Sequence, residues 1–266
     1  MTVTFEVGED HVGVVTLNRP AKLNAMDAAM FDGLTAAAAQ AAAAIADRQC
    51  RAVVVTGAGR AFSAGLDVSL FAGQAAGHAP DDEAIAGMQQ AFTAFEDLAV
   101  PTLAAVRGVA LGAGCQLALA CHLRVGATDA DFGLLEARWG LIPDLGATWR
   151  LPRIVGLSRA TDMAMTARRI AAPTALSWGL LDAVLGDAGE PGEFATAART
   201  FAVRLARSPT VATGAVAGLM RGSFAAGREQ ALLAERQAQQ RCLASADFVE
   251  AVRAGGQRRD AAFEGK

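Results

Sequence analysis

Two carboxylic acids and one amide in the middle of the chain have the side chains that could transfer a proton and orient the groups involved. Glu136 follows Leu134 and Leu135 in an apolar stretch, and such surroundings raise the pKa of a carboxyl group toward the range in which it exchanges protons. Gln116 stands in the first turn of a predicted apolar helix. Its amide would orient a carboxylate or a water molecule but would not exchange a proton itself. Asp144, eight residues after Glu136, adds a second carboxylate.

Asp144 also has an interpretation that involves no chemistry. It precedes "LGATWRL", where an aspartate is well placed to cap the following helix or to pair with Arg150. Residue types alone do not separate capping from catalysis, so both interpretations stay open.

Two glycine-rich turns offer backbone amides to a ligand. Strands predicted at 51–56 and 103–109 each lead into Gly-Ala-Gly, and glycines leave room for an approach to the main chain. Neither turn completes G-x-G-x-x-G, because Phe62 and Leu117 stand at the third glycine position, and neither is a P-loop. Ser63 lacks the first glycine of a nucleophile elbow and a histidine partner. Dinucleotide binding and serine hydrolysis are therefore disfavoured.

Strands and helices alternate around these residues. Alternating segments at 2–7 and 12–17 predict an N-terminal hairpin, and Asp27 is expected to cap an alanine-rich helix that ends near Asp47. A further strand is predicted at 122–127. Strands that alternate with helices predict an α/β protein, and the recurrence of strand, turn and helix favours stacked units.

The second half of the chain is predicted to be mostly helical. A helix start is expected at 208–209 and a long helix at 228–243. Residues 73–82 have the composition of a loop, and residues 187–193 form a short connector.

Composition excludes several classes of protein. The chain has 266 residues and a net charge of −3, so it lacks the basic field that nucleic acid binding requires. No run approaches the roughly 18 apolar residues of a membrane helix. Four sparse cysteines without a C-x-x-C pair favour a reducing compartment, and the three histidines lack metal-ligand spacing. Because the histidines lack this spacing, we expect no metal site. Because the N-terminus does not resemble a secretory signal, we expect a cytoplasmic protein.

Five segments together resemble the crotonase superfamily, the enoyl-CoA hydratases and isomerases. Their order and spacing match from about residue 3 to the C-terminus. The segments are "VVTLNRPAKLNAM", "GAGRAFSAGLDV", "VALGAGCQLALA", "FGLLEARWGLIPDLGATWRLPRIVG" and "ALSWGLLDAVL".

This resemblance implies an architecture and a class of ligand. The expected fold is an α/β crotonase (ClpP-like) spiral of repeated ββα units at 1–190, which carries the active site. A C-terminal helical region at 191–266 would mediate homotrimers, often paired as hexamers, and close the CoA pocket. The substrate would be an acyl-CoA thioester, with no cofactor beyond the coenzyme A that the substrate carries.

The resemblance also assigns binding residues. Two backbone N–H groups in this family bind the thioester oxygen and stabilise an enolate-like charge, and by position they belong to Leu66 and Ala113. Lys22 matches the lysine near the nucleotide phosphates, while Arg258 and Phe263 match the closing C-terminal segment. The residues expected along the CoA and acyl path are Lys22, Leu23, Ala25, Ala64, Asp67, Val68 and Gly112.

In this family, the carboxylates near the bound thioester determine which reaction takes place. Hydratases hold a water molecule between two glutamates; here Glu136 matches the second, while Gln116 occupies the position of the first. Asp144 stands where dienoyl-CoA isomerases carry an aspartate. We therefore favour isomerisation of an enoyl- or dienoyl-CoA double bond, with Glu136 moving the proton, Asp144 as second acid or base, and Gln116 orienting Glu136 or a water. The alternatives are hydration of a 2-trans-enoyl-CoA in fatty-acid β-oxidation and a non-catalytic acyl-CoA-binding subunit.

Overall fold

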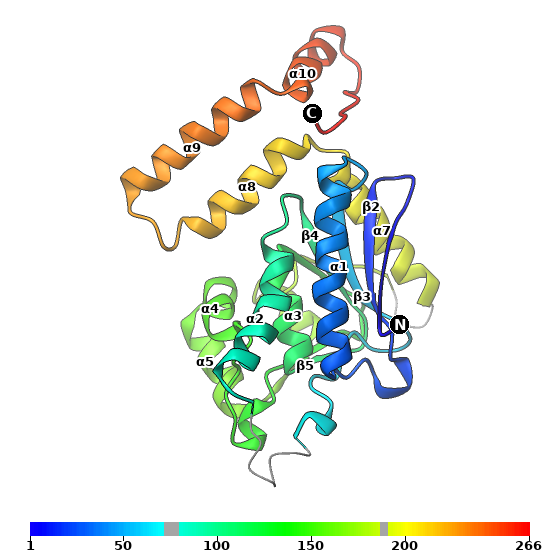
Figure 1. Ribbon diagram of the computed structural model, residues 1–266, viewed down its shortest axis with the longest axis vertical. Helices are drawn as coiled ribbons and strands as arrows, with labels where there is room; N and C mark the ends of the chain where they lie inside the picture. The colour runs from blue at the N-terminus through cyan, green and yellow to red at the C-terminus, as the bar shows by residue number, and fades with distance from the viewer. Residues whose placement is uncertain (72–79, 187–190) are drawn as a thin grey trace.

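Two β-sheets organise the residues that this computed structural model describes, 1–71, 80–186 and 191–266 (Figure 1). Most of the predicted loop at 73–82 and of the connector at 187–193 lies outside these ranges. β1 and β2 form the predicted antiparallel hairpin, and the rest of the larger sheet is parallel. In sheet order, the larger sheet comprises β1 (Val3–Val7), β2 (Val12–Leu17), β3 (Ala52–Gly57), β4 (Thr102–Val106), β6 (Leu123–Gly126) and β9 (Ala183–Val184), and the smaller comprises β5 (Val109–Leu111), β7 (Asp131–Gly133) and β8 (Arg169–Ala171).

The chain repeatedly crosses from the larger sheet to the smaller one and then enters a helix. β4 leads into β5 and then α3 (Ala113–Ala120), and β6 leads into β7 and, through η4 (Glu136–Trp139), into α4 (Ala147–Val155). After β3, Ser63 pairs with Ala110 of β5 before the chain reaches α2 (Asp82–Glu96). The predicted α/β class and the stacked units are confirmed.

The single strand predicted at 103–109 is wrong. The chain instead forms β4 and β5, which belong to different sheets. The break falls at Gly108, whose φ of 59° lies in the left-handed region. A Cβ at this position would overlap the carbonyl oxygen of Arg60. The glycine therefore allows the chain to turn against the segment around Arg60 and to reach the smaller sheet.

Helix α1 (Ala28–Ala46) begins at the predicted cap, because the Asp27 carboxylate accepts the N–H of Met30 at 3.0 Å. Its many alanines allow close packing against β1 and α2. Phe31 stacks on Phe92 of α2, with the ring centroids 5.7 Å apart. Among the described residues, α1 is also the one helix that is long and apolar enough to cross a membrane. In this fold one face of α1 packs in the core, through buried residues such as Met30, Phe31 and Leu34.

Both faces of the larger sheet are covered by helices. Successive residues of a strand point to opposite faces, so neighbouring residues of β3 pack against different helices. Val53 and Val55 of β3 belong to the core that α1, α2 and α3 complete. Ala52 and Val54 pack instead in the cluster formed with α7 (Pro191–Ala206). The site-bearing segments therefore emerge from a sheet that is buried on both sides.

The C-terminal helices extend away from the sheets (Figure 1). They are α8 (Thr210–Gly222), α9 (Arg228–Leu243) and α10 (Ala246–Gln257), and α9 has the bounds that the sequence predicts. These helices leave large apolar side chains exposed: Val216, Met220, Leu232, Leu233, Leu243, Phe248, Val249 and Val252. The remaining helical elements are η1 (Pro20–Lys22), η2 (Val68–Phe71), α5 (Leu157–Thr166) and α6 (Ala172–Ser177).

The packing of α1 on α2 predicts the effect of truncating Phe92. Phe92→Ala should lower the free energy of unfolding by about 3–5 kcal/mol, because it removes a fully buried ring and leaves a cavity. Urea denaturation followed by circular dichroism measures this. The control Met165→Ala, at a side chain that is 75% exposed, should stay within about 0.5 kcal/mol of wild type. Equal losses in the two variants would contradict the assigned core.

Candidate active site

Two backbone segments meet where Ser63-Ala64-Gly65 lies beside Gly112 at the start of α3. Gly65 has a φ of 103°, and a Cβ on it would lie 2.9 Å from the Leu111 carbonyl oxygen. Gly112 has a φ of 50°, and a Cβ on it would lie 3.9 Å from Gly65 Cα. Gly65 permits both the positive φ and the close approach, whereas Gly112 is favoured by its positive φ.

The predicted oxyanion amides follow these two glycines. Ala113 is the first residue of α3, so no carbonyl of the helix reaches its N–H. Leu66 pairs with Met26 in a single parallel bridge whose hydrogen bonds leave the Leu66 N–H unused. Within the described residues, neither N–H donates to an acceptor. The structure brings the two together, since a Cβ on Gly65 would lie 3.7 Å from the Ala113 nitrogen.

Ser63 serves this backbone contact and is not free to act as a nucleophile. Its N–H donates to Val109 and its carbonyl accepts from Leu111, which sets the register of the two segments. Its buried hydroxyl donates to the Asn24 carbonyl at 2.8 Å and accepts the Gly65 N–H at 3.2 Å. The low weight given to serine hydrolysis is consistent with these contacts.

Gln116 is buried, with 1% of its surface exposed, and its amide is fully oriented. Its Oε1 accepts the N–H groups of Leu145 at 2.8 Å and Ala147 at 3.2 Å. Its Nε2 donates to Glu136 Oε1 at 2.8 Å. Because two donors hold the amide oxygen, the amide nitrogen must face Glu136. The amide of Gln116 is therefore placed to orient the Glu136 carboxylate, one of the two roles expected of it.

Glu136 begins η4 and lies beside the main-chain contact, since a Cβ on Gly112 would be 3.5 Å from its Oε1. Its Oε2 is buried and has no hydrogen-bond partner among the described residues. Desolvation raises the pKa of Glu136, and the charge of Asp144 raises it further, whereas the hydrogen bond from Gln116 opposes the shift. The group is therefore a carboxyl that accepts a proton more readily than an exposed glutamate does.

Asp144 does not cap α4 and does not pair with Arg150. The N-cap of α4 is Gly146, without a side-chain cap, and Arg150 pairs with Glu96. Both structural interpretations of Asp144 are therefore wrong. Burial raises the pKa of Asp144, and its charge acts on Glu136. The structure thus brings Gln116, Glu136 and Asp144 to one site.

The residues predicted for the CoA edge come from two segments that lie side by side. The N–H of Ala64 donates to the Leu23 carbonyl at 2.9 Å, and the N–H of Met26 donates to Gly65 at 2.7 Å. Lys22 is exposed at the end of η1, and Leu23 has a φ of 50°. Ala25, Val68 and Gly112 lie on the same segments or beside them.

Asp67 is occupied by the protein itself. Its carboxylate accepts the Ser69 N–H at 3.0 Å and pairs with Arg19 at 3.0 Å, and these contacts, the Ser69 bond first, lower its pKa to about 2. Arg19 also pairs with Asp27, and the buried Asn24 donates to the carbonyls of residues 58 and 61. Sequence reasoning missed Arg19 and Asn24, although both stand in the matched "LNRPAKLNAM" segment.

The C-terminal segment lies far from Lys22 of the same chain. The Phe263 carbonyl accepts from Arg51 Nη1 at 2.6 Å, and Arg258 caps the end of α10. Arg51 follows α1 and Lys22 precedes it, so the length of a 19-residue helix, about 28 Å, separates the two ends. A single chain therefore does not bring Phe263 to its own Lys22. Figure 1 shows the C-terminus beside α10, far from the loop that precedes α1.

The arrangement can stabilise an oxyanion and move a proton beside it. It offers two unused backbone donors, the positive end of α3, and a carboxylate with one free oxygen. In the described ranges, no three His, Cys, Asp or Glu side chains gather as a metal site would require.

Comparisons with known proteins agree with this geometry. The sequence profile of the family "Enoyl-CoA hydratase/isomerase" matches residues 8–266. A Rhodobacter capsulatus protein named "Probable enoyl-CoA hydratase" is 37% identical over 265 residues, which cover 100% of this chain and 98% of that protein. The 1,2-epoxyphenylacetyl-CoA isomerase of Escherichia coli is 33% identical over 264 residues, 97% of each chain. The crystal structure of an enoyl-CoA hydratase from Bacillus anthracis is 28% identical, with a TM-score of 0.90 over 100% of both chains.

The chain belongs to the enoyl-CoA hydratase/isomerase family and has the crotonase fold. The resemblance seen in the five sequence segments is confirmed. The protein is therefore an enzyme of this lyase and isomerase family.

The raised pKa of Glu136 predicts a pH-dependent cost in stability. A carboxyl whose pKa is raised by folding stabilises the fold below its unfolded pKa of about 4.3, and that contribution is lost as the pH rises through the folded value. Glu136→Gln should therefore be more stable than wild type at about pH 8, with the difference shrinking toward about pH 4. Urea denaturation across this range measures the difference. Glu235→Gln, at an exposed position of α9, is the control, and a pH-independent difference for Glu136→Gln would contradict the burial of its charge.

Proposed function

We propose that this enzyme moves a double bond in an enoyl-CoA or dienoyl-CoA thioester. The observation that supports this best is the amide at position 116, which is fixed against Glu136. An amide does not supply the second proton-exchanging group that hydration between two glutamates uses. The carboxylates at hand are Glu136 and Asp144, and two carboxyl groups could transfer a proton between different carbons.

In the proposed mechanism, the N–H groups of Leu66 and Ala113 bind the thioester oxygen. Glu136 takes a proton from the α-carbon, and the electron pair of the broken C–H bond forms a dienolate whose charge rests on that oxygen. A proton then returns to the γ-carbon, or to a more distal carbon of a dienoyl substrate, where Asp144 acts as the acid. Loss of one hydrogen-bond donor to the thioester oxygen, such as the N–H of Leu66 or Ala113, typically slows a reaction by a factor of about 10²–10³.

The substrate would lie along the two paired segments. Lys22 would contact the nucleotide phosphates of CoA, and Leu23 and Ala25 would line the same edge. Ala64, Asp67 and Val68 would flank the pantetheine, with Asp67 acting through the loop that its carboxylate holds. No cofactor is proposed beyond the CoA of the substrate.

Hydration of a 2-trans-enoyl-CoA is the second candidate. It is favoured by the names of relatives such as the Rhodobacter capsulatus protein. In this case Gln116 would hold a water molecule, and Glu136 alone would exchange its protons.

Separate incubation with crotonyl-CoA and with a 3-enoyl-CoA distinguishes the two candidates. We expect the 3-enoyl substrate to give the conjugated 2-enoyl product, and crotonyl-CoA to give little 3-hydroxyacyl product, because only one carboxylate flanks the hydration position. Chromatography of the thioesters measures both. Rapid hydration without isomerisation would reverse this order.

Two variants test which carboxyl groups carry out the turnover observed in that experiment. Glu136→Gln should lower kcat by a factor of about 10²–10⁴ and leave acyl-CoA binding in place, which excludes a binding-only protein. Asp144→Asn should affect a dienoyl substrate more than a monoenoyl one, because only the longer proton transfer needs the second acid.

We further propose that residues 191–266 assemble the chain into a homotrimer, alone or paired as a hexamer, and that CoA-pocket closure comes from a neighbouring copy. The apolar side chains exposed on α8, α9 and α10 support assembly. The distance between Phe263 and Lys22 of one chain supports closure by another copy.

Light scattering on the purified protein should give the mass of a trimer or a hexamer. Val249→Asp, at an exposed valine of α10, should shift the mass toward the monomer, because a charge is costly in an apolar interface. A monomeric wild type would contradict the proposed assembly.

A further inference from the structure

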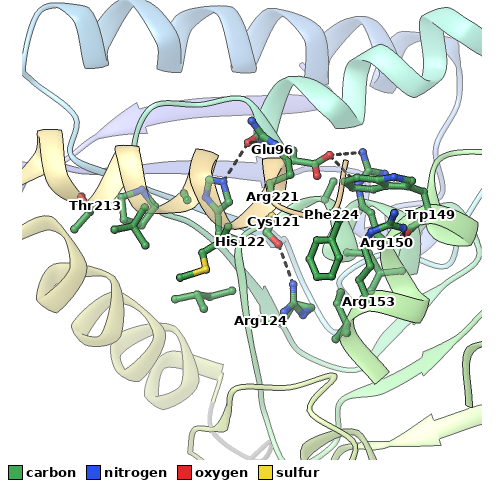
Figure 2. Close-up of a pocket in the computed structure, with 18 of the residues that line it drawn as sticks. Glu96, Cys121, His122, Arg124, Trp149, Arg150, Arg153, Thr213, Arg221 and Phe224 are labelled. Atoms are coloured by element: carbon green, nitrogen blue, oxygen red, sulfur yellow. Dashed lines mark hydrogen bonds and ion pairs between the residues drawn. The ribbon is translucent and has the colours of Figure 1, made fainter. Parts of the chain in front are cut away.

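Arg150 is a buried arginine of α4 whose guanidinium joins two parts of the chain. Its Nε and Nη2 donate to Glu96 Oε2 of α2 at 2.9 and 2.7 Å, and Nη2 also donates to Thr93 Oγ1 at 3.3 Å. Its Nη1 donates to the Leu145 carbonyl at 2.9 Å. Figure 2 shows the ion pair at the edge of a cavity of about 410 Å³ that α8 also lines. Arg150 is 6% exposed, so solvent and salt screen the pair little.

The main chain beside Arg150 is shaped to admit the guanidinium. Gly146 has a φ of 96°, and a Cβ on it would overlap Arg150 Nη1. A side chain at this position would therefore push the guanidinium away from the Leu145 carbonyl. The glycine serves the arginine contact as well as the turn.

The end of α2 that carries Glu96 is itself held in place. Arg221 of α8 donates to the Glu96 carbonyl and pairs with Asp97 at 3.1 Å. Gln89, on the same helix, donates to the Asp144 carbonyl at 2.6 Å. Glu96 is therefore a fixed anchor for Arg150.

Leu145 leads from Arg150 to the proposed base. While its carbonyl accepts from Arg150, its N–H donates to Gln116 Oε1 at 2.8 Å. Gln116 Nε2 then donates to Glu136 Oε1, also at 2.8 Å. Hydrogen bonds therefore connect Glu96 to Glu136 through the main chain of Leu145.

We propose that Arg150, held by Glu96, is a positioning residue that fixes Leu145 and thereby orients Gln116 and Glu136 for proton transfer. The proposal rests on the proposed role of Glu136. Arginine suits this task because its planar fork reaches Glu96 and the Leu145 carbonyl at once, whereas lysine offers a compact point charge.

Arg150→Lys and Glu96→Gln test the proposal, because one keeps the charge without the fork and the other keeps the shape without the charge. The hydrogen bond from Gln116 lowers the pKa of Glu136, so a loosened Gln116 raises that pKa. We expect the acidic limb of the pH profile of kcat/KM to move up by about one pH unit in both variants. Below the limb, kcat/KM should fall about tenfold, mostly through kcat.

Arg153→Lys is the matched control. Arg153 lies on the same helix but donates to the Trp149 carbonyl and stacks on that ring, 4.3 Å from its centroid. The Arg153→Lys variant should leave the acidic limb of the kcat/KM profile at its wild-type position. Gln116→Ala should raise the limb, and adding Arg150→Lys to it should produce no further shift, because the path is already cut. A wild-type limb in both Arg150→Lys and Glu96→Gln, or fully additive shifts, would overturn the proposal.

A second readout separates this proposal from the proposed reaction. Carbon NMR of protein labelled at its glutamate carboxyl groups, with Glu136→Gln for assignment, gives the pKa of Glu136 without turnover. Asp144 and the Cys115 thiol face Glu136 and are unchanged in every variant, and burial raises the pKa of Cys115 to about 12. If the Glu136 pKa rises in Arg150→Lys and Glu96→Gln while the wild-type enzyme catalyses only hydration, the proposed isomerisation fails and the positioning role stands. If Arg150→Lys does not fold, Glu96→Gln carries the test, and an unshifted Glu136 pKa there overturns the role.

Discussion

The close contact between the backbone at Gly65 and the backbone at Gly112 is the constraint on which the rest of the site depends. It places the start of α3 beside the Leu66 amide without the help of any charged side chain. The register is set by Ser63, whose N–H and carbonyl bond to Val109 and Leu111, on either side of Ala110 in β5. A Cβ on Gly114 would lie 2.6 Å from the Ser63 carbonyl oxygen. Small residues at these positions therefore allow the segments that carry the unused N–H groups of Leu66 and Ala113 to lie close together.

The amide at position 116 sets the character of the chemistry beside this contact. Its oxygen takes the first N–H of α4 together with that of Leu145, and its nitrogen is left for Glu136. A carboxylate here could accept the same two N–H groups, but it would have no proton to donate to Glu136 and would bring a second negative charge beside it. The glutamine thus gives Glu136 a fixed direction while one of its oxygens stays free.

Structural features that depend on residues close together in the sequence were predicted well, as the hairpin, the cap at Asp27 and the bounds of α9 show. The break at Gly108 was not predicted, because apart from Arg107 the residues on both sides of it are apolar, and the turn is evident only once the second sheet is seen. Arg150 selects Glu96, 54 residues away, over the nearby Asp144. No local pattern encodes the meeting of α2 and α4. The burial of Gln116 was predictable from its apolar helix, but the direction of its amide was set by backbone donors from another segment.

The chain contains three tryptophans and no tyrosine. Trp139 ends the short helix η4 that begins with Glu136, and it is 74% exposed. Trp149 and Trp178 lie against arginine side chains elsewhere. Indole therefore dominates the intrinsic ultraviolet emission of this protein, and Trp139 lies one helical turn from the Glu136 carboxyl group. The fold carries its own optical probe of that site, with no label attached.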